Sequence, residues 1–315
     1  MIAIGVDLGG TNIKAAIVHR DEGILEKVSL PTEADKGKDH VFDRIALAVQ
    51  QLLEKRRVDP VGIGMGSPGM VSLDRTTVKN PPNLTGWDVV KVTEEVKQRT
   101  GFNCIVENDA NLAALGSSRH GVGTDFDSLI MLTLGTGVGG GIIYNRQLFR
   151  GTTGSASELG HVIIDYHGPL SNSNTRGGIE AYLGQRFLSR YAADVIRQEP
   201  SNPLYEKFHD NFDALEPVYL YHAAEEGNSL AAGILQKTGE KLGYAIVNYI
   251  HILDIRKIVV SGGVAKAGKW LTEPAREMAL RYLMPPFHEG FEIIYEPLGN
   301  DAALYGASSL ALENL

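Results

Sequence analysis

The sequence predicts a two-domain α/β protein, and three observations support that prediction. The chain has 315 residues, of which 43% are hydrophobic and 22% are charged, so it can bury a sizeable core and has the length of about two domains. Strand-like apolar runs alternate with apolar positions at helical spacing. A pair of strand-like runs around a glycine turn opens the chain and recurs after residue 128.

The first half of the chain predicts the element order βββαβαβα. Three strand-like runs form an opening meander, and the turn between the first two contains Gly9 and Gly10. Helices and buried strands then alternate, and Gly101 marks the end of one helix. The predicted elements are strands at 2–7, 13–18 and 24–30, a helix at 41–53, a strand at 61–65, a helix at 89–96, a strand at 104–106 and a helix that begins near 112.

The second half repeats this organisation without a plain sequence repeat. Strands are predicted at 128–134 and 141–144, with a glycine turn between them. One long helix is predicted from near Asn228 to just before a strand at 257–260. We interpret the shared organisation as the result of a duplication.

Composition excludes several classes of protein. The chain has 30 Lys and Arg residues and 38 Asp and Glu residues, so its formal charge is −8. This negative charge does not favour a nucleic-acid partner. No apolar stretch reaches the ~20 residues of a membrane span, and the N-terminus enters a strand-like run without a secretory signal. The single cysteine, Cys104, excludes an intramolecular disulfide. We therefore expect a cytoplasmic protein without a membrane partner.

The glycine-rich motifs do not match the common nucleotide-binding templates. No GxxxxGK[ST] motif occurs, which excludes a P-loop enzyme. Residues 135–140 fit the spacing GxGxxG, but a dinucleotide fold needs a helix after the turn, and a strand is predicted there. Residues 64–69 fit the same spacing, so the pattern discriminates weakly in this chain.

The two hairpin turns nevertheless suit a phosphate group. Successive glycines expose backbone N–H groups, which form a concavity that binds anions. Asp7 precedes the first turn, and a carboxylate beside a phosphate requires a divalent cation between them. The pattern favours a nucleotide with Mg²⁺ over the alternative, two ordinary glycine hairpins.

Five motifs follow one another over nearly the whole chain: DLGGTNIK at 7–14, ENDAN at 107–111, LGTGVGGG at 134–141, ELGH at 158–161 and SGGV at 261–264. In this order and spacing they resemble the ROK family of sugar kinases and sugar-responsive repressors. The resemblance implies a two-domain actin-like, ribonuclease-H-like α/β fold with an active-site cleft between the domains.

The resemblance also implies domain limits and ligands. An N-terminal α/β domain spans 1–115, a C-terminal α/β domain spans 116–299, and a helix at about 300–315 returns to the first domain. ATP, Mg²⁺ and a hexose are the implied ligands, Asp7 holds Mg²⁺ directly or through water, and the implied assembly is a homodimer. The implied nucleotide-binding residues are Gly9, Gly10, Thr11, Asn12, Lys14, Gly135, Thr136, Gly137, Gly139, Gly262 and Gly263.

Asp109 is the candidate general base. Transfer of a γ-phosphoryl group to a sugar hydroxyl needs a carboxylate that accepts the hydroxyl proton. Asp109 follows an apolar strand and opens a helical stretch, which is where α/β sheets present reactive groups. The local pattern equally fits a helix N-cap, and the resemblance favours the base.

Sugar recognition requires carboxylates and amides that bind neighbouring hydroxyls. Taken singly, the candidate carboxylates fit solvated surface charges and the candidate histidine fits a buried core residue, but as a spaced set they fit a sugar site. The candidate residues are Asn108, Asp109, Glu158, His161 and Glu180, joined by resemblance by Asn83 and by the backbone at Ser67 and Gly69.

The chain departs from the family at one loop. Many members hold a structural zinc with the histidine of the ExGH motif and three cysteines of a CxCGxxGCxE segment. Here Ser171, Ser173 and Gly178 occupy the cysteine positions, while Gly177 and Glu180 remain. Zinc needs four good ligands, so we expect no structural zinc and a loop held by hydrogen bonds.

The leading hypothesis is an ATP- and Mg²⁺-dependent glucokinase of glycolysis, which forms glucose 6-phosphate. Kinases for mannose, fructose, N-acetylglucosamine or N-acetylmannosamine are alternatives, and contacts at C2 decide among the C2 variants. A non-catalytic regulator of the family carries a DNA-binding segment before the sugar domain, and Asp7 leaves no room for one. The lost cysteines suggest a third alternative, a sugar-binding remnant without activity.

Overall fold

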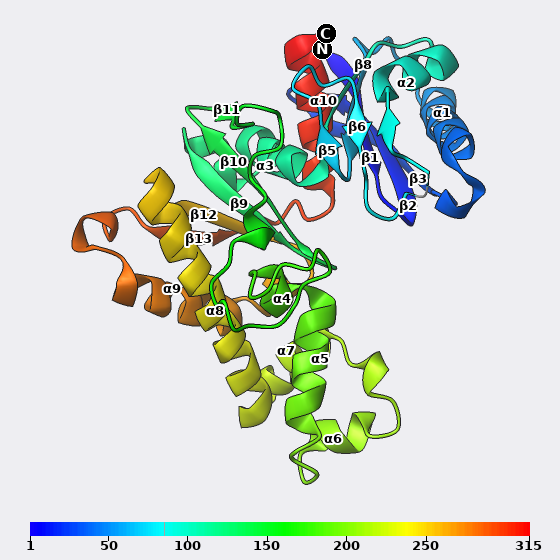
Figure 1. The fold of residues 1–315 in the computed structure, drawn as a ribbon. Coiled ribbons are helices and arrows are strands. Elements are labelled where there is room, and N and C mark those ends of the chain that lie inside the picture. Colours follow the sequence, from blue (N-terminus) through cyan, green and yellow to red (C-terminus); the bar gives the residue numbers. More distant parts are fainter. Residues whose placement is uncertain (85) are drawn as a thin grey trace. The chain divides into compact units, whose positions relative to one another are not determined.

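The computed structural model describes residues 1–84 and 86–315, and these form two compact units. The first unit comprises Met1–Ser128, Gly141–Ser157 and Leu298–Leu315, and the second comprises Leu129–Gly140 and Glu158–Pro297. Figure 1 labels the helices and strands along the chain. The domain division at 115/116 stays a prediction.

A five-stranded sheet forms the centre of the first unit. Its strand order is β3-β2-β1-β4-β8, in which the first three strands are antiparallel neighbours and β1, β4 and β8 run parallel. The carboxyl ends of these parallel strands therefore meet at one edge. The strands are β1 (Ile2–Leu8), β2 (Asn12–His19), β3 (Gly23–Pro31), β4 (Ile63–Ser67) and β8 (Cys104–Asn108).

The second five-stranded sheet has the order β11-β10-β9-β12-β13. It too joins an antiparallel hairpin to parallel strands, so the predicted shared organisation is confirmed. Its second strand begins at Val138, three residues earlier than predicted. The strands are β9 (Leu129–Leu134), β10 (Val138–Tyr144), β11 (Gln147–Leu148), β12 (Lys257–Ser261) and β13 (Glu292–Tyr295).

Helices complete each unit, and several lie where apolar spacing predicts them. The long helix predicted after Asn228 is α8, whose N-cap is Asn228. Helix α2 ends at the left-handed Gly101, as predicted. The helices are α1 (Lys38–Lys55), α2 (Val92–Thr100), α3 (Asp109–His120), α4 (Glu180–Leu183), α5 (Gln185–Ile196), α6 (Pro203–Phe208), α7 (Pro217–Glu225), α8 (Ser229–Leu253), α9 (Lys269–Tyr282) and α10 (Asp301–Asn314).

The sequence prediction is wrong near residue 89. The helix predicted at 89–96 starts at Val92, because Val89–Val90 form β7, which pairs with β6. Strands β5 (Met70–Val71), β6 (Val78–Lys79) and β7 form a small sheet that the sequence did not predict, since two-residue strands carry no readable alternation. The 3₁₀ turns are Ala34–Lys36, Val122–Asp125, Leu159–His161, Phe212–Ala214, Val264–Ala267 and Pro285–Phe287.

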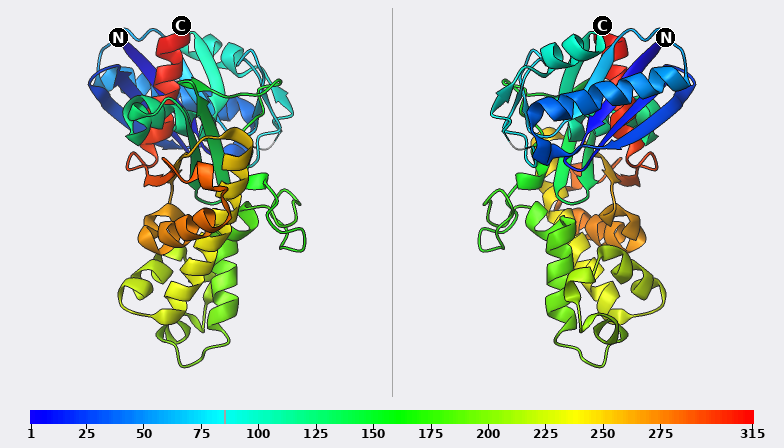
Figure 2. Two further views of the ribbon diagram at one scale, coloured as in Figure 1. Left: turned by 90° about the vertical axis from the view of Figure 1, so that its left-hand side faces the viewer. Right: turned by 90° about the vertical axis from the view of Figure 1, so that its right-hand side faces the viewer.

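The C-terminal helix α10 packs against α3, β1 and β4 within the first unit. Figure 2 shows both chain termini at the same end of this unit. The approach is close because glycines face the neighbouring backbone: a Cβ on Gly116 would overlap the carbonyl oxygen of Ala302, and one on Gly306 would overlap that of Leu112. In the described part of the chain, no helix combines the length and apolar character that a membrane span needs.

Replacement of Gly116 by alanine tests this close packing. We expect Gly116→Ala to lower the free energy of unfolding by about 1–3 kcal/mol or more, because the added methyl group meets rigid backbone. Gly233→Ala is the control, since Gly233 lies in α8 with open space around its Cβ position, and it should raise stability by about 0.5–1 kcal/mol. Urea unfolding measures both. Equal effects of the two substitutions would contradict the packing argument.

Candidate functional site

Two aspartates lie at the carboxyl edge of the first sheet. Asp7 is the penultimate residue of β1 and is in register with Gly66 of β4, which is in register with Glu107 of β8. Asp109 follows β8 directly and is the first residue of α3. The topology therefore places both carboxylates at the edge where α/β sheets bind ligands.

The N-cap of α3 is Asn108 and not Asp109. The Oδ1 atom of Asn108 accepts hydrogen bonds from the backbone N–H groups of Ala110 at 3.0 Å and Asn111 at 3.2 Å. The Oδ1 atom of Asp109 accepts a hydrogen bond from Ala110 N–H at 2.8 Å. The N-cap alternative for Asp109 is thus wrong, because Asn108 caps the helix. Burial raises the pKa of Asp109 above the usual aspartate range.

The charge near Asp7 is only partly compensated. The ammonium group of Lys14 lies 3.7 Å from Asp7 Oδ2. Burial raises the pKa of Asp7 to about 6, and the charge of Asp109 adds to that rise while Lys14 opposes it. Two carboxylates with one ammonium group suit a divalent cation, because Mg²⁺ is commonly held by one or two carboxylates together with phosphates. The residues present therefore fit Mg²⁺.

The first glycine turn is closed by hydrogen bonds and by a buried threonine. Gly9 N–H donates to Asn12 O at 3.0 Å, while Thr32 donates from its hydroxyl to Gly9 O at 2.6 Å and from its N–H to Thr11 O at 2.8 Å. A Cβ on Gly10 would lie 2.9 Å from the Cβ of Asn83. The fold thus brings the predicted sugar ligand Asn83 against the predicted phosphate turn.

The loop after β4 joins the same group of residues. Gly69 has a φ of 91°, and a Cβ there would lie 2.7 Å from Pro81 Cα, so the position requires glycine. The side-chain amide of Asn108 donates to Gly69 O at 3.4 Å. Ser67 is fully buried, and its hydroxyl donates to Pro68 O at 3.0 Å. Its side chain therefore faces protein, which leaves the backbone for the role predicted there.

In the second unit, Glu180 contacts the other glycine turn. Its Oε2 atom accepts from Val138 N–H at 3.2 Å, and a Cβ on Gly137 would overlap that oxygen. Gly262 has a φ of 97°, and a Cβ there would overlap Leu134 O at the end of β9. The predicted nucleotide residues Gly135–Gly137 and Gly262 are therefore neighbours. Glu180 stabilises the turn at 135–137 through its hydrogen bond with Val138 N–H.

The loop at 158–175 contains the other predicted sugar ligands. His161 Nε2 lies 3.7 Å from Glu158 Oε2. On its other side, His161 Nδ1 lies 3.1 Å from Ser173 Oγ, which also contacts Ser171 Oγ at 2.8 Å. Hydrogen bonds hold this loop, as expected. Within residues 1–84 and 86–315, no three His, Cys, Asp or Glu side chains are arranged to hold a metal ion, and the absence of zinc from the purified protein stays a prediction.

The sequence did not predict an ion-pair cluster around Glu107, the buried residue two positions before Asp109. Glu107 is fully buried, and its Oε2 atom lies 3.2 Å from Arg75 Nε and 2.6 Å from Arg150 Nε. Its Oε1 atom accepts from Asn108 N–H at 2.9 Å and from the Asn111 side chain at 3.2 Å. An acidic residue directly after the apolar run at 104–106 was the available signal.

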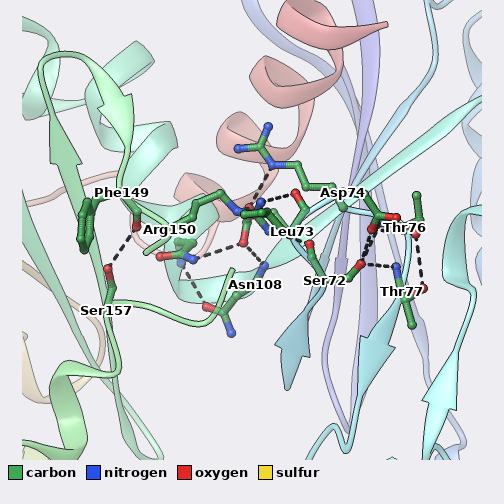
Figure 3. Close-up of polar contacts among 12 residues, drawn as sticks. Ser72, Leu73, Asp74, Thr76, Thr77, Asn108, Phe149, Arg150 and Ser157 are labelled. Atoms are coloured by element: carbon green, nitrogen blue, oxygen red, sulfur yellow. Dashed lines mark hydrogen bonds and ion pairs between the residues drawn. The ribbon is translucent and has the colours of Figure 1, made fainter. Parts of the chain in front are cut away.

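Arg150 extends this cluster to a turn of the small sheet. It donates to Leu73 O at 2.6 Å and to Ser72 O at 2.8 Å. Figure 3 shows the Arg150 side chain directed toward these residues, with Asn108 nearby. Nothing in the sequence around Arg75 or Arg150 indicates this partnership, because both arginines lie outside periodic elements and meet Glu107 over a long sequence separation.

Comparison with known proteins gives a consistent result. The ROK family model matches residues 3–314. A glucokinase of Thermotoga maritima is 35% identical over 312 residues, which cover 99% of this chain and 98% of that protein, and an N-acetylmannosamine kinase of Salmonella typhi is 26% identical over 99% and 98%.

The solved structures agree. A ROK family glucokinase from Streptomyces griseus, in complex with glucose and AMPPNP, has a TM-score of 0.86 and 32% identity, with full coverage of both chains. The two-domain actin-like fold class predicted from the sequence is confirmed.

The buried cluster predicts a large stability effect of Glu107. Glu107→Gln removes the buried charge that pairs with two guanidinium groups, so the free energy of unfolding should fall by about 3 kcal/mol or more. The control is Glu313→Gln, which breaks a more exposed pair with Arg119 and should change stability by less than about 1 kcal/mol. Urea unfolding compares the variants, and a small loss for Glu107→Gln would refute the role of the cluster.

Proposed function

The chain belongs to the ROK family and is a sugar kinase, and we propose that it transfers the γ-phosphoryl group of ATP to the 6-hydroxyl of glucose with Asp109 as the general base. The observation that carries this proposal is the position of Asp109 at the carboxyl edge of the sheet. Because Asn108 caps the helix, the Asp109 side chain is not needed as the N-cap. The glucose and AMPPNP bound to the Streptomyces griseus relative support the choice of both substrates.

Asp109 acts on the proton of the acceptor hydroxyl. As the hydroxyl oxygen attacks the γ-phosphorus, the bond from that phosphorus to the bridging oxygen breaks and ADP leaves. The carboxylate accepts the hydroxyl proton, and the increased basicity that burial gives Asp109 favours this proton transfer. The carboxylate must be ionised to act, so activity rises with pH through its pKa. Because that pKa is raised, the acid limb of the pH profile lies above the ordinary aspartate range.

The nucleotide is bound by the two glycine turns. Residues 9–12 and 135–137, with Gly262 and Gly263, supply backbone N–H groups, and Lys14 adds positive charge near Asp7. Asp7 is the residue that would hold Mg²⁺, directly or through water, and the cation would neutralise charge on the phosphates. Glu180 keeps the second turn in shape through Val138 N–H.

The sugar is bound by amides, carboxylates and a histidine. The residues proposed for this role are Asn83, the Asn108 amide and the backbone at 67–69, together with Glu158 and His161. Glu180 was assigned to this set from the sequence, and its contact with the glycine turn adds a second role. A homodimer and a cytoplasmic location remain predictions.

Asp109→Asn tests the base. The substitution keeps the size and hydrogen bonding of the side chain but removes the proton acceptor, so turnover should fall by roughly 10²-fold or more while sugar binding persists. ADP release measures turnover and calorimetry measures binding. Asp127→Asn, at an exposed position, serves as the control and should keep full activity. Near-normal turnover of Asp109→Asn would exclude the base role.

A hexose panel tests the acceptor. Glucose should give the highest kcat/KM, with another aldohexose or an N-acetylamino sugar second and fructose third. A site that hydrogen-bonds a hydroxyl discriminates against an analogue lacking it by ~10⁴-fold. The 26% identical N-acetylmannosamine kinase makes that sugar the informative competitor. Preference for an N-acetylamino sugar with negligible glucose turnover would refute the glucose assignment and leave the sugar kinase in place.

A further inference from the structure

Three hydroxyl groups of one loop form a cluster, and one of them, that of Ser173, contacts His161. Ser173 Oγ lies 3.1 Å from His161 Nδ1, 2.8 Å from Ser171 Oγ and 3.1 Å from Thr175 Oγ1. A serine hydroxyl donates one hydrogen bond and accepts two. These three partners therefore use the full capacity of the Ser173 oxygen.

The surroundings give these hydrogen bonds a direction. Ser171 is buried, and its contact with Ser173 gives its hydroxyl proton an acceptor. On the far side of the imidazole, Glu158 Oε2 lies 3.7 Å from Nε2, and a carboxylate favours a proton on the nitrogen that faces it. Nδ1 is then the acceptor, so Ser173 donates to it and Thr175 donates to Ser173.

We propose that Ser173 is a positioning residue that holds His161 in the tautomer with its proton on Nε2. His161 then presents an N–H donor beside the Glu158 carboxylate acceptor, and such a pair matches two neighbouring sugar hydroxyls. The hydroxyl cluster of Ser171, Ser173 and Thr175 thereby contributes to sugar recognition without touching the sugar. This role rests on the sugar kinase function proposed above.

The loop backbone does not depend on these hydroxyls. Ser171 N–H donates to Thr175 O at 2.9 Å, Asn174 N–H donates to Ser171 O at 3.1 Å, and Gly177 N–H donates to Pro169 O at 2.7 Å. The Ser173 side chain is exposed. Ser173→Ala should therefore keep the loop folded and remove only the contact with the imidazole.

Nitrogen-15 NMR of the imidazole rings tests the tautomer in the sugar-free protein, independently of any activity. At a pH of about 8, where histidine is ordinarily neutral, the His161 signals should show a protonated Nε2 and an unprotonated Nδ1. Comparison with His161→Gln identifies these signals. Ser173→Ala should give a mixture of tautomers, and Ser173→Thr should restore the single form. A protonated Nδ1 in the native protein, or an unchanged spectrum in Ser173→Ala, would overturn the proposal.

Kinetics then test the role in sugar binding. Ser173→Ala should raise the KM for glucose by about tenfold with little change in kcat or in the KM for ATP, and Ser173→Thr should recover the native KM. Ser201→Ala, an exposed serine of the same unit, is the control. If the tautomer changes and the KM for glucose does not, the positioning role is wrong. If glucose is not a substrate while the NMR result holds, the acceptor assignment fails, and the same KM comparison is made with the preferred sugar.

Discussion

The geometry of the first unit's site depends on one buried carboxylate, Glu107. Its two oxygens have separate roles: Oε2 faces the guanidinium groups of Arg75 and Arg150, and Oε1 accepts from Asn108 N–H and the Asn111 side chain. A buried charge is tolerated only when it is paired and hydrogen-bonded. The contacts of Glu107 thus connect the end of β8 with the turn at 72–77 and with the chain after β11. They also hold the first turn of α3, the helix that begins with Asp109.

A second constraint is the charge at the same edge of the sheet. Burial raises the free energy of the ionised form of Asp7, the charge of Asp109 adds to that rise, and Lys14 opposes it. In the absence of a cation, ionised Asp7 therefore destabilises the folded state, and its raised pKa reflects this loss of stability. Placing two carboxylates at this edge therefore costs stability, which a bound cation would restore.

The sequence predicted those parts of the fold that depend on local periodicity. The strands of the two sheets other than β11 and β13, the long helix α8 and the left-handed Gly101 follow from apolar alternation, helical spacing and glycine chemistry. Long-range contacts were not predictable in this way. The partners of Glu107 are distant in sequence, the contact of Glu180 with Val138 N–H depends on tertiary packing, and the choice between Asn108 and Asp109 as N-cap depends on backbone geometry that a sequence pattern does not contain.

The loop around His161 is held differently from the segments that meet at the Glu107 cluster. A metal ion or a buried ion pair fixes the chain and orients its ligands with the same bonds, so loss of one ligand affects both stability and geometry. In this loop, backbone hydrogen bonds fix the chain, and side-chain hydroxyls act on the imidazole. Stability and ligand orientation are therefore carried by different bonds. Loss of a hydroxyl should therefore change the contact with the imidazole while the fold remains intact, which the Glu107 cluster does not allow.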